Sequence, residues 1–235
     1  MTENNSRWGA AIGGGAIGSA LTAVVLVLAA PSLIGERLVR QAIVNHPDIL
    51  VEASDALRDR QYAPTLAAQR ANIETPFYSS WKGAAKPEVT LAYYYDYACG
   101  YCRKSNPDID RLIAEDKGLR VIFHEMPILG PTSLAASRVA LAASKAGKFA
   151  AFHGALNAAG NPTPAALAQA AAAAGVSPEP QDIADQEAAL KRNFEVAGQL
   201  GATGTPLFVV GDRVINSAVG YDVLKDAIAD ARAKG

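Results

Sequence analysis

Apolar runs and helical periodicity divide most of the chain into short strands and longer helices. The eight residues from Val89 are dense in Tyr, Val and Thr, and 119–126 is a second apolar run, so both are predicted to be buried strands. A helix-length segment separates the two, which predicts that they lie parallel. Two further short strands, 207–210 and 213–216, flank Gly211-Asp212, a pair suited to a two-residue hairpin turn.

The segment from Ser133 to Leu200 is rich in alanine and has helical spacing throughout. Glycines end its helices, and a Thr-Pro pair starts the third one, as the usual residue preferences at helix ends require. The expected helices are 133–146, 148–158, 163–175 and 181–200. A last amphipathic helix is predicted from Tyr221 to Ala233. The pattern therefore predicts an α/β fold in which the helices of 133–200 lie between the first two strands and the last two.

The N-terminal part of the chain is organised differently. Residues 9–34 carry no charge and are long enough to span about 30 Å of hydrocarbon as a helix. A cleaved signal peptide has an apolar region of only about 7–15 residues, so a signal anchor over 1–35 is favoured. Both interpretations export the rest of the chain to an oxidising compartment.

Residues 36–73 alternate charged and apolar positions at helical spacing, with a break at His46-Pro47. Their apolar face is narrow, which predicts that they lie outside the core of the C-terminal domain. An oligomerisation stalk and a simple helical spacer both remain open. The polar stretch 74–88 is interpreted as a linker, and 89–235 as the C-terminal domain.

Composition narrows the function classes. The chain has 235 residues and a net charge of −1, with no basic patch, which argues against a nucleic-acid partner. Its only two cysteines are Cys99 and Cys102, placed where the first strand passes into a helix. A helix N-terminus favours an anion, and Cys-X-X-Cys thiols in such a position have pKa values of roughly 3.5–7.5 instead of ~8.5. This placement predicts thiol–disulfide exchange.

Three other uses of the cysteine pair are weaker. A structural disulfide over so short a loop constrains the unfolded chain little. A zinc site lacks a second cysteine pair, and His46, His124 and His153 show no ligand spacing, so neither a metal nor a cofactor is expected. Inert buried thiols are the third alternative. The spacing alone does not decide whether Thr205-Pro206, before the third strand, is a cis-proline loop or an ordinary loop proline.

Four stretches of the sequence resemble a known family. They are DYACGYCRK (96–104), FHEMPILGP (123–131), ATGTP (202–206) and FVVGDRVINSAVGYDVLKDAI (208–228). Together they resemble the DsbA-like branch of the thioredoxin superfamily, and most narrowly the ScsC- and Com1-like periplasmic thiol–disulfide oxidoreductases. The resemblance spans roughly residues 36–232. It implies a thioredoxin-like fold with an inserted helical subdomain.

The resemblance also assigns site residues. It implies that Cys99 is the nucleophile, Cys102 the resolving cysteine, Gly100 and Tyr101 the dipeptide that tunes redox poise, and Thr205 and Pro206 the substrate-binding cis-proline loop.

One position departs from the family pattern. Related sequences often carry a glutamate where this chain has Tyr93, and that acid helps move the proton of the resolving cysteine. Asp96 could replace it, or could be a surface or helix-capping residue. His124 could be a proton shuttle or a packed strand residue.

The resemblance implies a periplasmic protein anchored to the inner membrane through 9–34, or secreted after signal cleavage. We expect it to exchange disulfides with cysteine-containing substrate proteins and with a membrane redox partner. A dimer or trimer formed through 36–73 would favour isomerase work, and a monomer would favour dithiol oxidation. The alternative from another class is a carrier that holds Cu(I) between the two cysteines.

Overall fold

A computed structural model describes residues 35–181 and 183–234. The predicted signal or anchor segment, 9–34, lies outside these residues. Within the described ranges, every helix is too short or too polar to cross a membrane. The chain divides into two compact units, with the boundary between Leu57 and Arg58.

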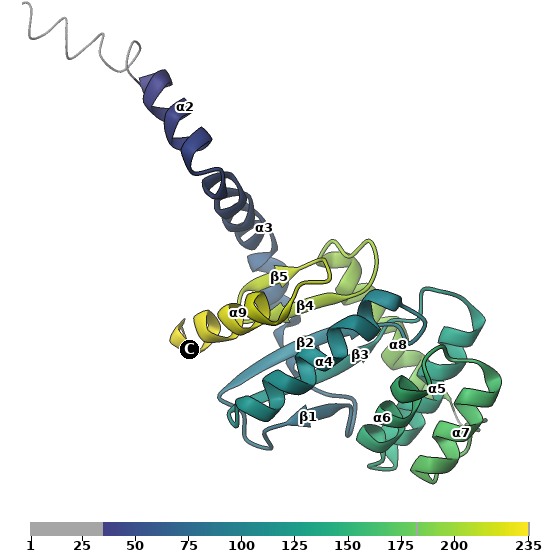
Figure 1. Cartoon of the computed structure of the whole chain (residues 1–235). Coiled ribbons are helices and arrows are strands. Elements are labelled where there is room, and N and C mark those ends of the chain that lie inside the picture. Colours follow the sequence, from purple (N-terminus) through teal and green to yellow (C-terminus); the bar gives the residue numbers. More distant parts are fainter. Residues whose placement is uncertain (1–34, 182, 235) are drawn as a thin grey trace, which may run out of the picture. The chain divides into compact units, whose positions relative to one another are not determined.

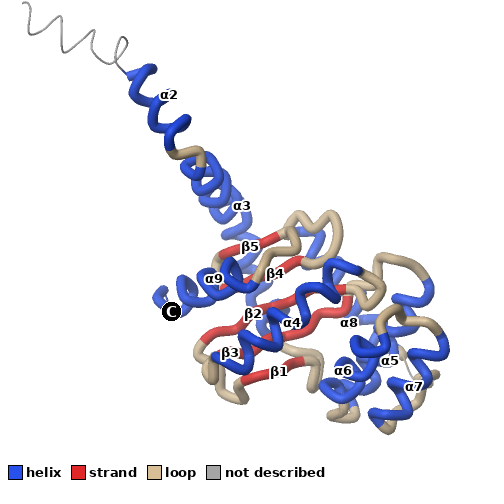
Figure 2. The backbone as a smooth tube through the Cα atoms, viewed as in Figure 1, coloured by secondary structure: helices blue, strands red, loops and turns tan. Residues whose placement is uncertain are grey.

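The second unit is built on one five-stranded sheet (Figures 1 and 2), in the order β1-β3-β2-β4-β5. The strands are β1 (Trp81–Gly83), β2 (Val89–Tyr95), β3 (Leu119–Glu125), β4 (Leu207–Val210) and β5 (Arg213–Ile215). The parallel pairing of β2 with β3 and the antiparallel β4–β5 hairpin confirm the prediction from the apolar runs. Strand β1, which pairs antiparallel with β3, was not predicted, because three residues that include a lysine and a glycine show no periodicity.

Helices cover both faces of this sheet. They are α4 (Gly100–Glu115), α5 (Pro131–Lys145), α6 (Phe149–Ala159), α7 (Pro164–Ala174), α8 (Ala184–Gln199) and α9 (Tyr221–Lys234). Side chains alternate along β2: Tyr93 and Tyr95 join the core shared with α4, α5, α6, α7 and α9, whereas Ala92 and Tyr94 join the core shared with α8. The inserted subdomain, α5 to α8, follows the predicted helices closely.

The remaining helices are α2 (Gly35–Asn45) and α3 (Asp48–Glu74). The prediction that this region lies outside the core is wrong for the end of α3. Leu66 and Ile73 are 1% and 2% exposed and pack with Tyr94 on the α8 side of the sheet. The prediction failed because it rested on the apolar residues up to Leu57, none of which is buried, whereas the buried side chains come later in α3.

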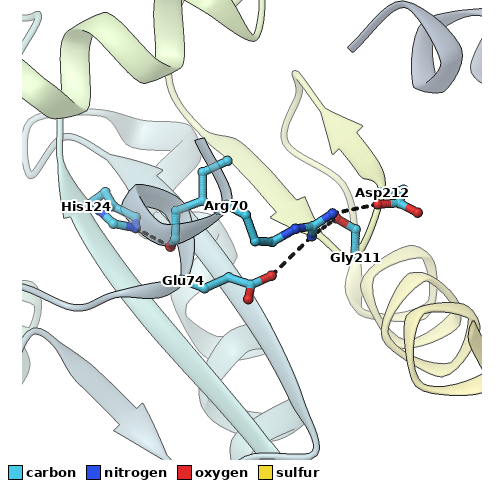
Figure 3. Close-up of polar contacts among 6 residues, drawn as sticks. Arg70, Glu74, His124, Gly211 and Asp212 are labelled. Carbon is cyan, nitrogen blue, oxygen red and sulfur yellow. Dashed lines mark hydrogen bonds and ion pairs between the residues drawn. The ribbon is translucent and has the colours of Figure 1, made fainter. Parts of the chain in front are cut away.

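Polar contacts reinforce the packing of the end of α3 within the second unit (Figure 3). Arg70 donates to the Gly211 carbonyl at 2.8 Å and to the Asp212 carboxylate at 2.7 Å, in the turn between β4 and β5. The His124 imidazole on β3 lies 2.8 Å from the Ile73 carbonyl, one of the last carbonyls of α3, which have no partner inside the helix. These contacts make residues 58–74 part of the unit that carries the cysteines.

Candidate functional site

The two cysteines lie where β2 ends and α4 begins. Cys99 is the residue that caps α4: its sulfur accepts a hydrogen bond from the Cys102 backbone N–H at 3.4 Å. The Cys99 thiol also donates to the Thr205 carbonyl at 3.3 Å, and the Thr205–Pro206 peptide bond is cis. Residues that are about a hundred positions apart in the sequence therefore meet at one sulfur atom.

Cys102 lies deeper than Cys99, at 1% exposure. Burial raises the pKa of the Cys102 thiol to about 12, although a backbone hydrogen bond from Asp96 acts against this rise. Cys102 therefore keeps its proton at neutral pH. Tyr101, in the first turn of α4 between the two buried cysteines, is in contrast 64% exposed.

Tyr93 lies beneath the cysteine turn. Its hydroxyl donates to the Cys102 carbonyl at 3.1 Å, and both groups are buried. Burial raises the pKa of Tyr93 well above its ordinary value, so the hydroxyl stays neutral. Tyr93 supports the start of α4, but it is no substitute for a carboxylate that accepts a proton.

Asp96 is fully buried, which excludes the surface position considered for it. Its carboxylate accepts hydrogen bonds from the backbone N–H groups of Ala98 at 2.7 Å, Ile128 at 2.8 Å and Leu129 at 2.9 Å. Its own carbonyl accepts from the Cys99 N–H at 3.1 Å. Asp96 thus caps the cysteine turn and also holds the loop that follows β3.

His124 is the packed strand residue. Its ring stacks on Tyr94, with centroids 4.5 Å apart, and its Nε2 bonds the Ile73 carbonyl, on the α8 side of the sheet. Burial lowers the pKa of His124 to about 4, so it is neutral at physiological pH. Its contacts place it in the packing of α3, whereas Cys99 and Cys102 pack in the core on the other face of the sheet.

A buried polar cluster lies between β3 and the inserted helices, and the sequence reasoning missed it. The Glu125 carboxyl oxygens accept hydrogen bonds from the Tyr95 hydroxyl and, at 2.7 Å, from the Ser137 hydroxyl. The Tyr95 and Tyr97 hydroxyls both lie within hydrogen-bonding distance of His153 Nδ1, at 3.4 and 3.1 Å. The signal was present in the alternation of β3, because Glu125 shares the inward face of Val121 and Phe123.

We expect Glu125→Gln to stabilise the protein increasingly as pH rises. Burial raises the pKa of Glu125 to about 8, so between about pH 4.5 and pH 8 the fold holds a proton that the unfolded chain releases. Stability falls with pH across that window, at about 1.4 kcal/mol per unit. Glutamine is neutral and of the same shape, so the variant escapes this loss.

Denaturant unfolding at pH 5 and pH 8 measures the effect. The difference between variant and wild type is expected to shift by about 3 kcal/mol in favour of Glu125→Gln between the two values. Titration of His124 affects wild type and Glu125→Gln alike, so it cancels in the difference between their free energies of unfolding. An equal difference at both pH values would show that Glu125 is ionised in the fold.

Comparison with known families agrees with this geometry. Residues 90–229 match the family described as DSBA-like thioredoxin domain. Residues 36–63 match the family described as copper resistance protein ScsC N-terminal domain, which covers α2 and the first part of α3.

Solved structures show the same fold. A periplasmic thioredoxin-like protein from Salmonella enterica serovar Typhimurium is 29% identical, with a TM-score of 0.64 over 70% of this chain and 95% of that one. A linker-deletion variant of Proteus mirabilis ScsC is 29% identical, with a TM-score of 0.69 over 85% and 94%. The thiol-disulfide exchange protein alpha-DsbA2 from Wolbachia pipientis is 25% identical, with a TM-score of 0.66 over 76% and 97%.

One curated protein also matches. The Na(+)/H(+) antiporter NhaA 1 of Salinispora arenicola is 26% identical over 157 residues. The match takes in 64% of this chain but only 24% of the antiporter's length. Because the match covers so little of the antiporter, it assigns no transport activity to this chain.

Proposed function

The chain belongs to the DSBA-like thioredoxin-domain family of thiol–disulfide oxidoreductases, and we propose that it is an exported enzyme that exchanges and isomerises disulfides in other proteins. The observation that carries the proposal is the environment of Cys99, which caps α4 beside a buried Cys102 thiol and the Thr205 carbonyl. The periplasmic relative supports a periplasmic location. Cysteine-containing proteins are the proposed substrates, and a membrane redox protein is the proposed partner that resets the cysteine pair.

Cys99 is proposed as the nucleophile because it is the sulfur that receives a backbone N–H. Its thiolate attacks a substrate disulfide, one substrate sulfur leaves as a thiolate and takes up a proton, and a mixed disulfide forms. Cys102 resolves this intermediate: its thiol loses a proton, attacks Cys99 and releases the second substrate thiol. The two electrons gained by the substrate come from the Cys99–Cys102 pair, which ends as a disulfide.

Isomerisation needs a different ending. The released substrate thiolate attacks a second disulfide of the same substrate and frees one of its sulfurs as a thiolate. That thiolate attacks the mixed disulfide, forms a new substrate disulfide and expels the Cys99 thiolate, so there is no net oxidation. The high pKa of Cys102 supports this course, because a protonated Cys102 resolves the mixed disulfide slowly at neutral pH. Gly100 and Tyr101, which lie between the two cysteines in the sequence, are proposed to tune the balance between the two endings. Thr205 and Pro206 are proposed to face the substrate chain.

Reactivation of a protein with scrambled disulfides tests this function. The reduced full-length chain is expected to restore activity to scrambled ribonuclease faster than its oxidised form does. Oxidation of reduced ribonuclease by the oxidised form, without any reactivation by the reduced form, would identify a dithiol oxidase. Absence of both activities would overturn the proposal.

We further propose that residues 36–57 form an oligomerisation stalk. The match to the ScsC N-terminal domain supports this proposal. So does the exposure of large apolar residues in this segment, including Leu38 at 58%, Val44 at 72% and Leu50 at 55%. Such a row of exposed apolar side chains on helices is typical of a face that contacts another chain.

The double variant Leu38→Lys, Leu50→Lys is expected to be monomeric, because two charges would be buried in the contact between copies. The mass of the full-length protein in detergent solution measures this by light scattering. Gln41→Lys with Gln61→Lys adds the same charge without removing apolar surface and is expected to keep the multimer. A wild-type monomer would contradict the stalk.

Cu(I) binding by the same thiols is a second candidate, which the matched domain's description as part of a copper resistance protein favours. Paired thiolates suit this soft ion. A carrier would bind Cu(I) tightly and show no turnover with scrambled ribonuclease. An enzyme would turn over scrambled ribonuclease even in the presence of a copper chelator.

A further inference from the structure

The loop of residues 201–206, between α8 and β4, brings a backbone carbonyl to the cysteine pair. The Cys99 thiol donates to the Thr205 carbonyl at 3.3 Å. This hydrogen bond exists only while Cys99 carries its proton, because a sulfur in a disulfide has none to donate. A carbonyl held at this place therefore stabilises the reduced cysteine pair relative to the oxidised one.

Tyr62 of α3 covers the start of this loop. Gly201 has a left-handed φ of 71°, and a Cβ at its position would fall 2.0 Å from the Tyr62 hydroxyl oxygen and 2.9 Å from the ring carbon Cζ. The end of the Tyr62 side chain therefore lies directly on the Gly201 backbone, a close approach that only glycine permits.

The core beneath the loop is completed by the same helix. Tyr62 is half-buried and packs against a cluster that contains Leu66 of α3 together with Leu200 and Leu207. The last two residues flank the loop in the sequence, one on each side. Side chains of α3 therefore support the loop at its start and pack against the residues at both of its ends.

We propose that Tyr62 is a positioning residue: through Gly201 it holds the loop where the Thr205 carbonyl accepts from Cys99, and it thereby favours the reduced cysteine pair. The inference rests on the proposed thiol–disulfide exchange and assigns part of its redox balance to α3. Tyr62 lies within the match to the ScsC N-terminal domain, 36–63, and outside the match to the DSBA-like domain, 90–229. A reduced pair is the form that begins isomerisation, so this contact supports that course.

Equilibration of the full-length protein with glutathione tests the inference. The two protein thiols lose two electrons and two protons to one glutathione disulfide, which becomes two glutathione thiols. Tyr62→Ala is expected to raise the equilibrium constant of this oxidation about threefold, near the low end for loss of a hydrogen bond because a thiol is a weak donor. Acid quenching, alkylation of the remaining thiols and mass spectrometry measure the oxidised fraction.

Two control variants separate positioning from stability. Tyr62→Phe keeps the ring beside Gly201 and is expected to keep the wild-type constant. Tyr78→Ala removes a tyrosine that is 58% exposed in the segment before β1, and it is expected to keep the constant too. A purely structural role of Tyr62 would lower the stability of the reduced and oxidised forms alike and leave the constant unchanged.

The outcomes distinguish this inference from the proposed function. An unchanged constant in folded Tyr62→Ala, or an equal rise in Tyr78→Ala, would overturn the positioning role while the proposed function stands. A wild type that exchanges no disulfide with glutathione would overturn the proposed function itself.

Hydrogen exchange followed by NMR locates the change in the loop. The Gly201 and Ala202 N–H groups donate to the Gly198 and Ala197 carbonyls of α8, at 3.0 and 2.9 Å. Both are expected to exchange faster in reduced Tyr62→Ala than in the reduced wild type. Unchanged exchange at both groups would show that Tyr62 does not hold the loop. Should Tyr62→Ala not fold, Tyr62→Leu decides both comparisons, because leucine keeps an aliphatic group in the core but is too short to reach Gly201.

Discussion

Cys99→Ala is expected to abolish both reactivation of scrambled ribonuclease and oxidation of dithiols, down to the uncatalysed rate. No other sulfur can replace it, because the chain has only two cysteines and Cys102 is buried with a raised pKa. The fold is expected to tolerate the change, since alanine leaves the sheet and α4 intact. Turnover assays and thermal unfolding of the same samples measure the two effects separately.

Cys102→Ala is the matched control for this variant. It keeps the sulfur that caps α4 and removes only the sulfur that is proposed to resolve a mixed disulfide. Net oxidation is expected to stop, whereas exchange that begins and ends at Cys99 continues. Full dithiol oxidation by Cys99→Ala would contradict the assignment of the nucleophile.

Leu66→Ala is expected to destabilise the unit that carries the cysteines by about 2–5 kcal/mol, the range for removing a buried leucine side chain. Leu66 belongs to α3, yet it packs among Tyr94, Leu200 and Val209 on the α8 side of the sheet. Alanine would leave a cavity in that core. Denaturant unfolding, followed by the fluorescence of Trp81 on β1, measures the loss.

Leu57→Ala is the control on the same helix. Leu57 is 68% exposed, nine residues before Leu66, and its truncation is expected to change stability by no more than about 0.5 kcal/mol. Equal effects of the two substitutions would show that the end of α3 is not part of the folded unit.

The sequence predicted most of the fold because its strands and helices carry strong local signals. The run from Val89, the Gly211-Asp212 turn and the Thr163-Pro164 helix start each correspond to an element in the structure. Strand β1 could not be predicted, because its pairing with β3 decides its conformation. The end of α3 was misjudged for a related reason: whether Leu66 is buried depends on a sheet that lies far along the chain.

The candidate site was predictable where short motifs carry it. Cys99, Cys102 and the Thr205–Pro206 pair are brought together as the family resemblance implied. The supporting residues were harder to predict. Asp96 could be singled out from the sequence but not assigned, because its partners Ile128 and Leu129 come from another loop.

The mass of a trapped intermediate tests the central claim most directly. The full-length Cys102→Ala variant is incubated with a protein that carries a disulfide, quenched with acid, digested without reductant and analysed by mass spectrometry. We predict a mixed disulfide between Cys99 and a substrate cysteine, which disappears on treatment with dithiothreitol. Absence of any adduct on Cys99, while the Cys102→Ala variant remains folded, would contradict thiol–disulfide exchange at this site.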